Sequence, residues 1–155
     1  MSLGDENQRF GIYWLFFGYT LALHVLDEAA HDFLSVYLPN AIAIRRALPC
    51  LPIPLFNFQS WIGSLALALA LFLAMTPLAL RGEKWLRWLA VPVAIIPGIL
   101  NGSAHILSSI YMKRMMPGVY SAPLLLFSGT LLLRSARTRK ATAAERADSG
   151  ATKGS

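Results

Sequence analysis

Residues 10–34 read FGIYWLFFGYTLALHVLDEAAHDFL, an apolar stretch that carries five His, Asp and Glu side chains in its second half. As a helix, this stretch rises about 1.5 Å per residue and crosses the ~30 Å hydrocarbon core of a bilayer with some tilt. An ionisable side chain inside a membrane helix costs about 3 kcal/mol on insertion scales, and such residues mark functional sites by default. The window from His24 to Asp32 is therefore the first candidate site, since it holds three of the eight carboxylates and two of the three histidines.

The composition of the 155-residue chain is that of a membrane protein. Hydrophobic residues make up 55% of it and charged residues only 14%, whereas an average soluble domain carries about 25% charge. The formal net charge of +6 does not indicate a nucleic-acid partner, because the basic residues gather at the ends of apolar segments and in the C-terminal tail. We expect membrane lipids to surround this protein.

The order of the apolar segments predicts an all-α fold, a four-helix transmembrane bundle that forms a single membrane domain over residues 10–134. A kink is expected in the third span at Pro97 and Gly98. The predicted spans cover residues 10–34, 58–80, 85–111 and 119–133.

The remaining segments are polar or proline-rich. Residues 1–9 are predicted to be a solvated cytoplasmic leader. Residues 35–57 are predicted to be an outer loop, because their prolines lack the backbone donor that a helix uses; within this loop, residues 40–48 could form a short interfacial helix. Residues 135–155, rich in Arg, Ala, Thr and Ser, are predicted to be a disordered basic tail in the cytoplasm.

The distribution of Lys and Arg predicts the orientation in the membrane. With four spans, ten basic residues fall on the side of the two termini and four on the other side. Because positively charged loops stay in the cytoplasm, we predict a multi-pass protein of the inner membrane with both termini cytoplasmic. The four residues on the outer side are Arg45, Arg46, Lys113 and Arg114.

The polar side chains of the first span form one seam. At about 100° per residue, the polar side chains of this window, His24, Asp27, Glu28, His31 and Asp32, fall within an arc of about 140° on the helix surface. Apolar residues occupy the opposite side of the helix. This arrangement predicts that the seam faces the interior of the bundle and not the lipid.

The third span repeats this pattern, with Asn101, His105 and Ser108 on one face. The first and third spans run in the same direction across the membrane. His24 and Asn101 lie roughly 21 and 24 Å from the cytoplasmic ends of their helices. The two seams are therefore predicted to meet at one buried pocket in the outer half of the bilayer.

A family resemblance follows from these residues. The run His24-x-x-Asp27-Glu28, with Asn101 in a later helix and a Pro117-Gly118 turn after it, resembles the HXXEE-domain family of small integral membrane proteins. The resemblance covers about residues 13–132 and implies an integral membrane protein with a suspected enzymatic activity. Asp27 stands where the family has Glu, so this carboxylate is one methylene shorter.

A metal site is the first chemical hypothesis for the seam. His24, Glu28 and His31, at positions i, i+4 and i+7, place two imidazoles and a carboxylate on one face, and His105 could complete the set from the third span. Such ligands suit a single Zn²⁺ or Fe²⁺ ion. A di-iron site is disfavoured, because the chain lacks a second Glu-x-x-His motif.

Proton transfer without a metal is the alternative chemistry. A His–Glu pair one turn apart in a membrane pocket can serve as general acid and base. Its substrate would be a lipidic or isoprenoid molecule that enters from the bilayer, and its reaction a hydrolysis or an isomerisation. The candidate catalytic residues are His24, Asp27, Glu28 and Asn101.

Non-catalytic roles complete the set of hypotheses. Polar contacts can simply hold membrane helices together, at about 0.6 kcal/mol each, or bind a metal or lipid without catalysis. Five ionisable groups on one seam are more than helix association needs. A transport function is disfavoured for a monomer, because four short helices form a small pore at best. Assembly into a homo-oligomer is compatible with the sequence.

Overall fold

The computed structural model describes the backbone of residues 3–151 and the side chains of residues 4–137. Within these residues the chain is helical and contains no strand, which confirms the predicted all-α class. One element, η1, is a π-helical segment. In chain order the elements are α1 (Leu3–Ala30), α2 (Phe33–Ala47), α3 (Phe58–Ala74), α4 (Thr76–Arg81), α5 (Lys84–Val93), η1 (Ala94–Leu100), α6 (Asn101–Met112) and α7 (Ala122–Ala151).

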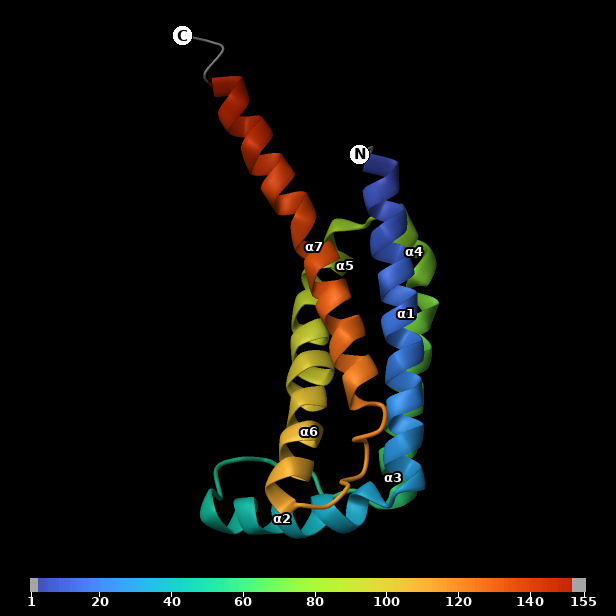
Figure 1. The fold of residues 1–155 in the computed structure, drawn as a ribbon, viewed down its shortest axis with the longest axis vertical. Coiled ribbons are helices and arrows are strands. Elements are labelled where there is room, and N and C mark those ends of the chain that lie inside the picture. Colours follow the sequence, from blue (N-terminus) through green and yellow to red (C-terminus); the bar gives the residue numbers. More distant parts are fainter. Residues whose placement is uncertain (1–2, 152–155) are drawn as a thin grey trace.

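The helices form rods that alternate in direction, and α2 lies across one end of them (Figure 1). α1 runs toward that end, α3 and α4 return, α5, η1 and α6 run parallel to α1, and α7 returns again. α7 packs against both α1 and α6. The end of the bundle that α2 covers is called the α2 end. α1 begins and α7 ends at the opposite end of the bundle.

Three helical segments among the described residues are long and apolar enough to cross a membrane: Gly4–Ala30, Phe58–Arg81 and Lys84–Met112. These segments agree with the membrane protein that the composition predicts. The predicted fourth span, residues 119–133, is not among them. The helical apolar part of α7, from Ala122 to Leu133, rises only roughly 18 Å, which is less than the hydrocarbon core.

The first helix differs from its predicted bounds of 10–34 at both ends. α1 begins at Leu3, so the described part of the predicted leader is helical. α1 ends at Ala30, and Asp32 takes a left-handed conformation with a φ of 53°, which Asp tolerates better than most residues. The chain changes direction there, and Phe33 begins a new helix.

The predicted outer loop over residues 35–57 is helical in its first part. α2 covers Phe33–Ala47 with Pro39 inside it, and its Leu34 and Ala41 are buried. Burial of these two side chains offsets the free-energy cost of one proline inside the helix. The sequence-based prediction gave that proline too much weight. The non-helical segment is shorter, residues 48–57, and contains Pro49, Pro52 and Pro54.

The C-terminal region also differs from its prediction. Disorder was expected from residue 135, but α7 is helical as far as Ala151. Ala, Arg, Lys and Glu are strong helix formers, and a helix that packing has already nucleated propagates through them at little further cost. Residues 152–155 of the predicted tail lie outside the described residues.

The apolar core occupies the half of the bundle away from the α2 end. Phe10, Trp14 and Phe17 of α1 are completely buried there. The Trp14 indole Nε1 donates a hydrogen bond to the Phe72 carbonyl oxygen at 2.9 Å, and the two rings stack with centroids 4.0 Å apart. The same buried stripe of α1 continues through Thr20 toward the α2 end, where it becomes polar.

Two glycines allow η1 and α7 to approach closely. A Cβ on Gly129 would lie 3.1 Å from the Ala94 carbonyl oxygen and 3.2 Å from the Cα of Gly98. The π-helical segment surrounds Pro97, the position where the sequence predicts an irregularity. η1 leads directly into α6 at Asn101, so this close contact lies just before the polar side chains of α6.

We predict that Gly129→Val lowers the free energy of unfolding by about 1–3 kcal/mol, the usual cost of overpacking a close contact. Gly63→Val is the matched control, because no atom lies within 4 Å of a Cβ built on Gly63. Thermal unfolding in detergent measures both variants. Equal unfolding temperatures for the two would contradict the role of the η1–α7 contact.

Candidate functional site

Three buried ionisable side chains meet near the α2 end. His24 and Glu28 extend from α1 and His105 from α6, and their exposed fractions are 1%, 6% and 8%. One ligand atom from each residue lies within 4.8 Å of the others. The two predicted seams therefore do meet, and we call these three residues the His–Glu–His cluster.

Two distances within the cluster are those expected between ligands of a single metal ion. Glu28 Oε1 lies 3.5 Å from His24 Nε2 and 3.0 Å from His105 Nε2. Ligand atoms that bind one Zn²⁺ or Fe²⁺ ion at about 2.0–2.2 Å lie about 3.0–3.5 Å apart. Two imidazole nitrogens and a carboxylate oxygen are also the donor types that these ions prefer, and they leave a coordination position for water or substrate.

A serine in the turn before α7 orients the His24 ring. Ser121 Oγ donates to Asp27 Oδ2 at 2.7 Å, and the Ser121 backbone N–H donates to the same oxygen at 2.9 Å. With its one proton so engaged, the hydroxyl accepts a hydrogen bond from His24 Nδ1–H, 2.9 Å away. This hydrogen bond places an imidazole proton on Nδ1 and leaves Nε2, with its lone pair, as the nitrogen that faces Glu28.

Asn101 completes the polar surroundings of His24. Its Nδ2 lies 3.0 Å from His24 Nε2 and donates to that lone pair. An ion bound at Nε2 would take the place of this hydrogen bond. The Asn101 amide would then be free to bind an oxygen of a ligand.

Gly118 lies against both imidazoles. Its φ is +83°, and a Cβ built there would lie 2.9 Å from the Cε1 atoms of His24 and His105. A side chain at this position would collide with both rings. The turn before α7 therefore needs glycine for its backbone conformation and for its closeness to the cluster.

His31 is not part of the cluster, contrary to its predicted place among the metal ligands. It lies beyond the last residue of α1, and its side chain is 48% exposed. Its Nδ1 lies 2.9 Å from Asp27 Oδ1 and 2.8 Å from the Asp27 carbonyl oxygen. The i+7 position shares a face with His24 only if the helix continues, and α1 ends at Ala30.

Asp27 and Asn101, predicted as catalytic, both lie beside His24 but in different roles. Asp27 contacts His24 only through Ser121, so it positions the ring and does not face the space between the cluster residues. Sequence reasoning missed Ser121 altogether. A serine three residues after the Pro117-Gly118 turn carries no signal of its own, because its importance comes from the packing of α7 on α1.

The cluster and its supports together provide the parts of a metal centre or of an acid–base site: two oriented imidazoles, a carboxylate between them and an amide. Comparison with family models, with curated proteins and with solved structures finds no match for this chain.

We predict that Ser121→Ala lowers the free energy of unfolding by about 1–3 kcal/mol, because it leaves the Asp27 carboxylate without its hydroxyl partner. Ser64→Ala is the matched control, since the Ser64 hydroxyl bonds only the Trp61 carbonyl of its own helix. Thermal unfolding compares the two. If both variants unfold like the unmodified protein, the Asp27–Ser121–His24 chain does not stabilise the bundle.

Proposed function

We propose that this chain is an HXXEE-type integral membrane enzyme that acts on a lipidic or isoprenoid substrate, with one Zn²⁺ or Fe²⁺ ion held by His24, Glu28 and His105. The observation that carries the proposal is the burial of these three side chains with their ligand atoms within 4.8 Å. Buried ionisable groups in a membrane helix are costly. An ion that all three bind would offset that cost.

The surroundings of His24 support a metal ligand. Imidazoles that bind metals usually donate their other ring N–H to a carboxylate, a carbonyl or water, which fixes the tautomer and strengthens the ligand. Here His24 Nδ1 donates to Ser121, whose hydroxyl donates to the Asp27 carboxylate. This arrangement leaves Nε2 available as a ligand.

A bound ion would supply a Lewis acid or an activated water for attack on an ester or phosphate group. The residues of the chain have separate tasks in this scheme. His24, Glu28 and His105 bind the ion, Asp27 and Ser121 hold the His24 ring, and the Asn101 amide orients a substrate oxygen. Gly118 keeps the space beside the imidazoles free of a side chain.

We further propose that α7 serves as the fourth crossing helix and that both termini are cytoplasmic in an inner membrane. Its apolar turns pack along α1 and α6, so it follows the rods that are long enough to span. The end where α1 begins and α7 ends also carries the larger group of Lys and Arg residues, as the positive-inside rule requires.

Metal-free acid–base catalysis is the second candidate function, and one contact favours it. Glu28 Oε1 lies 3.0 Å from His105 Nε2, a hydrogen-bond distance that needs no ion between the atoms. A His–Glu pair in this contact can transfer a proton to and from a substrate. A non-catalytic cluster that only holds α1 to α6 would use the same contact.

Metal analysis separates these functions. We predict that the protein purified in detergent contains one Zn or Fe ion per chain and that His105→Ala and Glu28→Gln lose it. Removal of a ligand should cost at least the roughly 10–100-fold in affinity that loss of a supporting residue costs. His31→Ala is the matched control and should keep the ion, because His31 lies outside the cluster.

Elemental analysis by mass spectrometry measures the metal content of the four proteins. A wild-type protein without stoichiometric metal would overturn the metal centre and leave acid–base catalysis as the proposed chemistry. Loss of the ion from His31→Ala as well would show that the ion binds elsewhere.

Catalysis itself is tested by lipid composition. We predict that cells that express the wild type and cells that express Glu28→Gln differ in at least one membrane lipid, measured by mass spectrometry of total lipid extracts. Asp32→Asn is the control, because it removes an exposed carboxylate from the same window. Identical lipid profiles, together with a less stable Glu28→Gln protein, would favour the purely structural role.

A further inference from the structure

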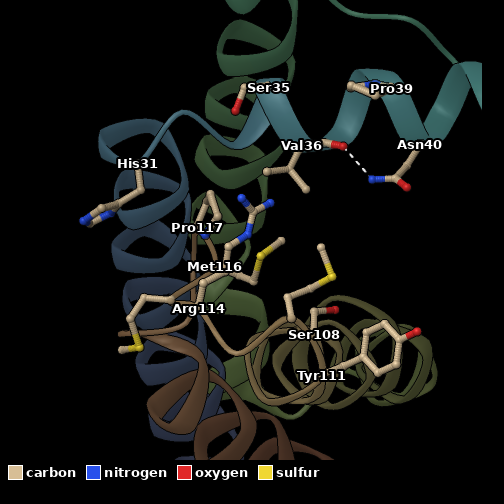
Figure 2. Close-up of a pocket in the computed structure, with 12 residues that line it drawn as sticks. His31, Ser35, Val36, Pro39, Asn40, Ser108, Tyr111, Arg114, Met116 and Pro117 are labelled. Atoms are coloured by element: carbon tan, nitrogen blue, oxygen red, sulfur yellow. Dashed lines mark hydrogen bonds between the residues drawn. The ribbon is translucent and has the colours of Figure 1, made fainter.

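A second feature of the α2 end is a cavity of about 720 Å³ that is separate from the His–Glu–His cluster. It lies between α2, the last turn of α6 and the turn after it (Figure 2). Its walls combine apolar and polar side chains, among them Val36, Pro39, Ser108, Tyr111, Arg114 and Met116. A cavity of this size can hold a polar headgroup with the first part of its apolar chains.

Arg114 gives the cavity a positive charge. Figure 2 shows its guanidinium reaching from the turn after α6 toward Val36 of α2. Within the described residues, the Arg114 guanidinium has neither a carboxylate nor a hydrogen-bond acceptor as a partner, and the hydroxyls of Ser108 and Tyr111, which also line the cavity, form no hydrogen bond. A guanidinium without an acidic partner is suited to phosphate, which accepts several hydrogen bonds and pairs with Arg in a bidentate manner.

The location of the cavity favours a lipid as the source of that phosphate. Three candidate spans have an end here, at Ala30, Phe58 and Met112, and α2 lies across these ends. Lipid headgroups surround the ends of membrane helices. The exposed charges of this end are mainly positive, since Asp32 is accompanied by Arg45, Arg46, Lys113 and Arg114.

The cavity and the cluster share one stretch of chain. Met116 and Pro117 line the cavity, and the next residue, Gly118, lies against the His24 and His105 rings. Ser109 holds this stretch to α6, because its hydroxyl accepts a hydrogen bond from the Met116 backbone N–H at 3.1 Å. His24 lies roughly 9 Å below the end of α1. A phosphate in the cavity would therefore place the linkages beneath it close to the cluster.

We infer that this cavity binds the phosphate headgroup of an anionic amphiphile, with Arg114 as the principal contact, and that it positions the substrate for the His–Glu–His cluster. The binding step stands on the cavity alone, whereas the positioning step rests on the proposed function. The substrate class is then a phosphate-bearing lipid or isoprenoid whose reactive bond lies on the membrane side of the phosphate.

Lipid retention tests the binding step. The full-length protein in detergent is mixed with equal amounts of phosphatidylglycerol and phosphatidylcholine, and the lipid that stays bound through gel filtration is measured per chain. We expect the wild type to retain phosphatidylglycerol preferentially. Arg114→Ala should retain roughly tenfold less, the effect of one charge-assisted contact.

Arg46→Ala is the matched control, because it removes the same charge from an exposed position on α2 that does not line the cavity. It should keep the preference for phosphatidylglycerol. Equal retention by Arg114→Ala and Arg46→Ala would overturn the inference and leave only general attraction between charges. If inorganic phosphate alone displaces the lipid, the ligand of the cavity is a soluble phosphate compound and not an amphiphile.

Metal content measured on the same samples distinguishes this inference from the proposed function. Arg114→Ala should lose the lipid and keep the metal, whereas Glu28→Gln should lose the metal and keep the lipid. A wild-type protein that retains phosphatidylglycerol through Arg114 but contains no metal would support the headgroup site in the cavity and rule out the metal centre. A loss of lipid in Glu28→Gln equal to that in Arg114→Ala would overturn the separate headgroup site.

Discussion

The burial of Glu28 between two imidazoles is the constraint on which the α2 end of this bundle depends. A carboxylate inside a membrane helix needs partners that lipid does not offer. Glu28 Oε1 finds such a partner in His105 Nε2 of α6, 3.0 Å away, while His24 Nε2 of its own helix lies 3.5 Å away. These contacts require α1 and α6 to run in parallel with their polar seams at the same depth, so one carboxylate fixes the relative placement of two rods.

α7 and the turn before it act on the same site through small residues. Gly129 lets α7 approach η1, Gly118 lets the turn before α7 lie against the imidazoles, and Ser121 joins the Asp27 carboxylate to His24. Each of these contacts would be lost with a larger side chain or a shifted helix. The polar groups of α1 are therefore satisfied by residues that come from elements distant in sequence, which makes the cluster a property of the whole bundle.

How far the site could be predicted depended on how far helical periodicity held. His24 and Glu28 are one turn apart within α1, and Asn101 and His105 are one turn apart within α6, so the 100° rotation per residue correctly placed each pair on one face. His31 failed because α1 ends at Ala30 and Asp32 adopts a left-handed conformation. The prediction at Pro39 was also wrong because of tertiary packing. A proline predicts a helix break, but burial of Leu34 and Ala41 keeps α2 helical.

Sequence alone is enough to identify a helical membrane protein and to place its buried ionisable side chains on polar seams of two helices. Composition and periodicity decide both, because each helix must be apolar toward lipid and its ionisable groups must face inward. The packing of the helices adds that His105 and not His31 joins His24 and Glu28, that Ser121 and Gly118 support them, and that a cavity lies nearby. Those features depend on where helices end and which helix packs against which, and neither follows from the local pattern of one segment.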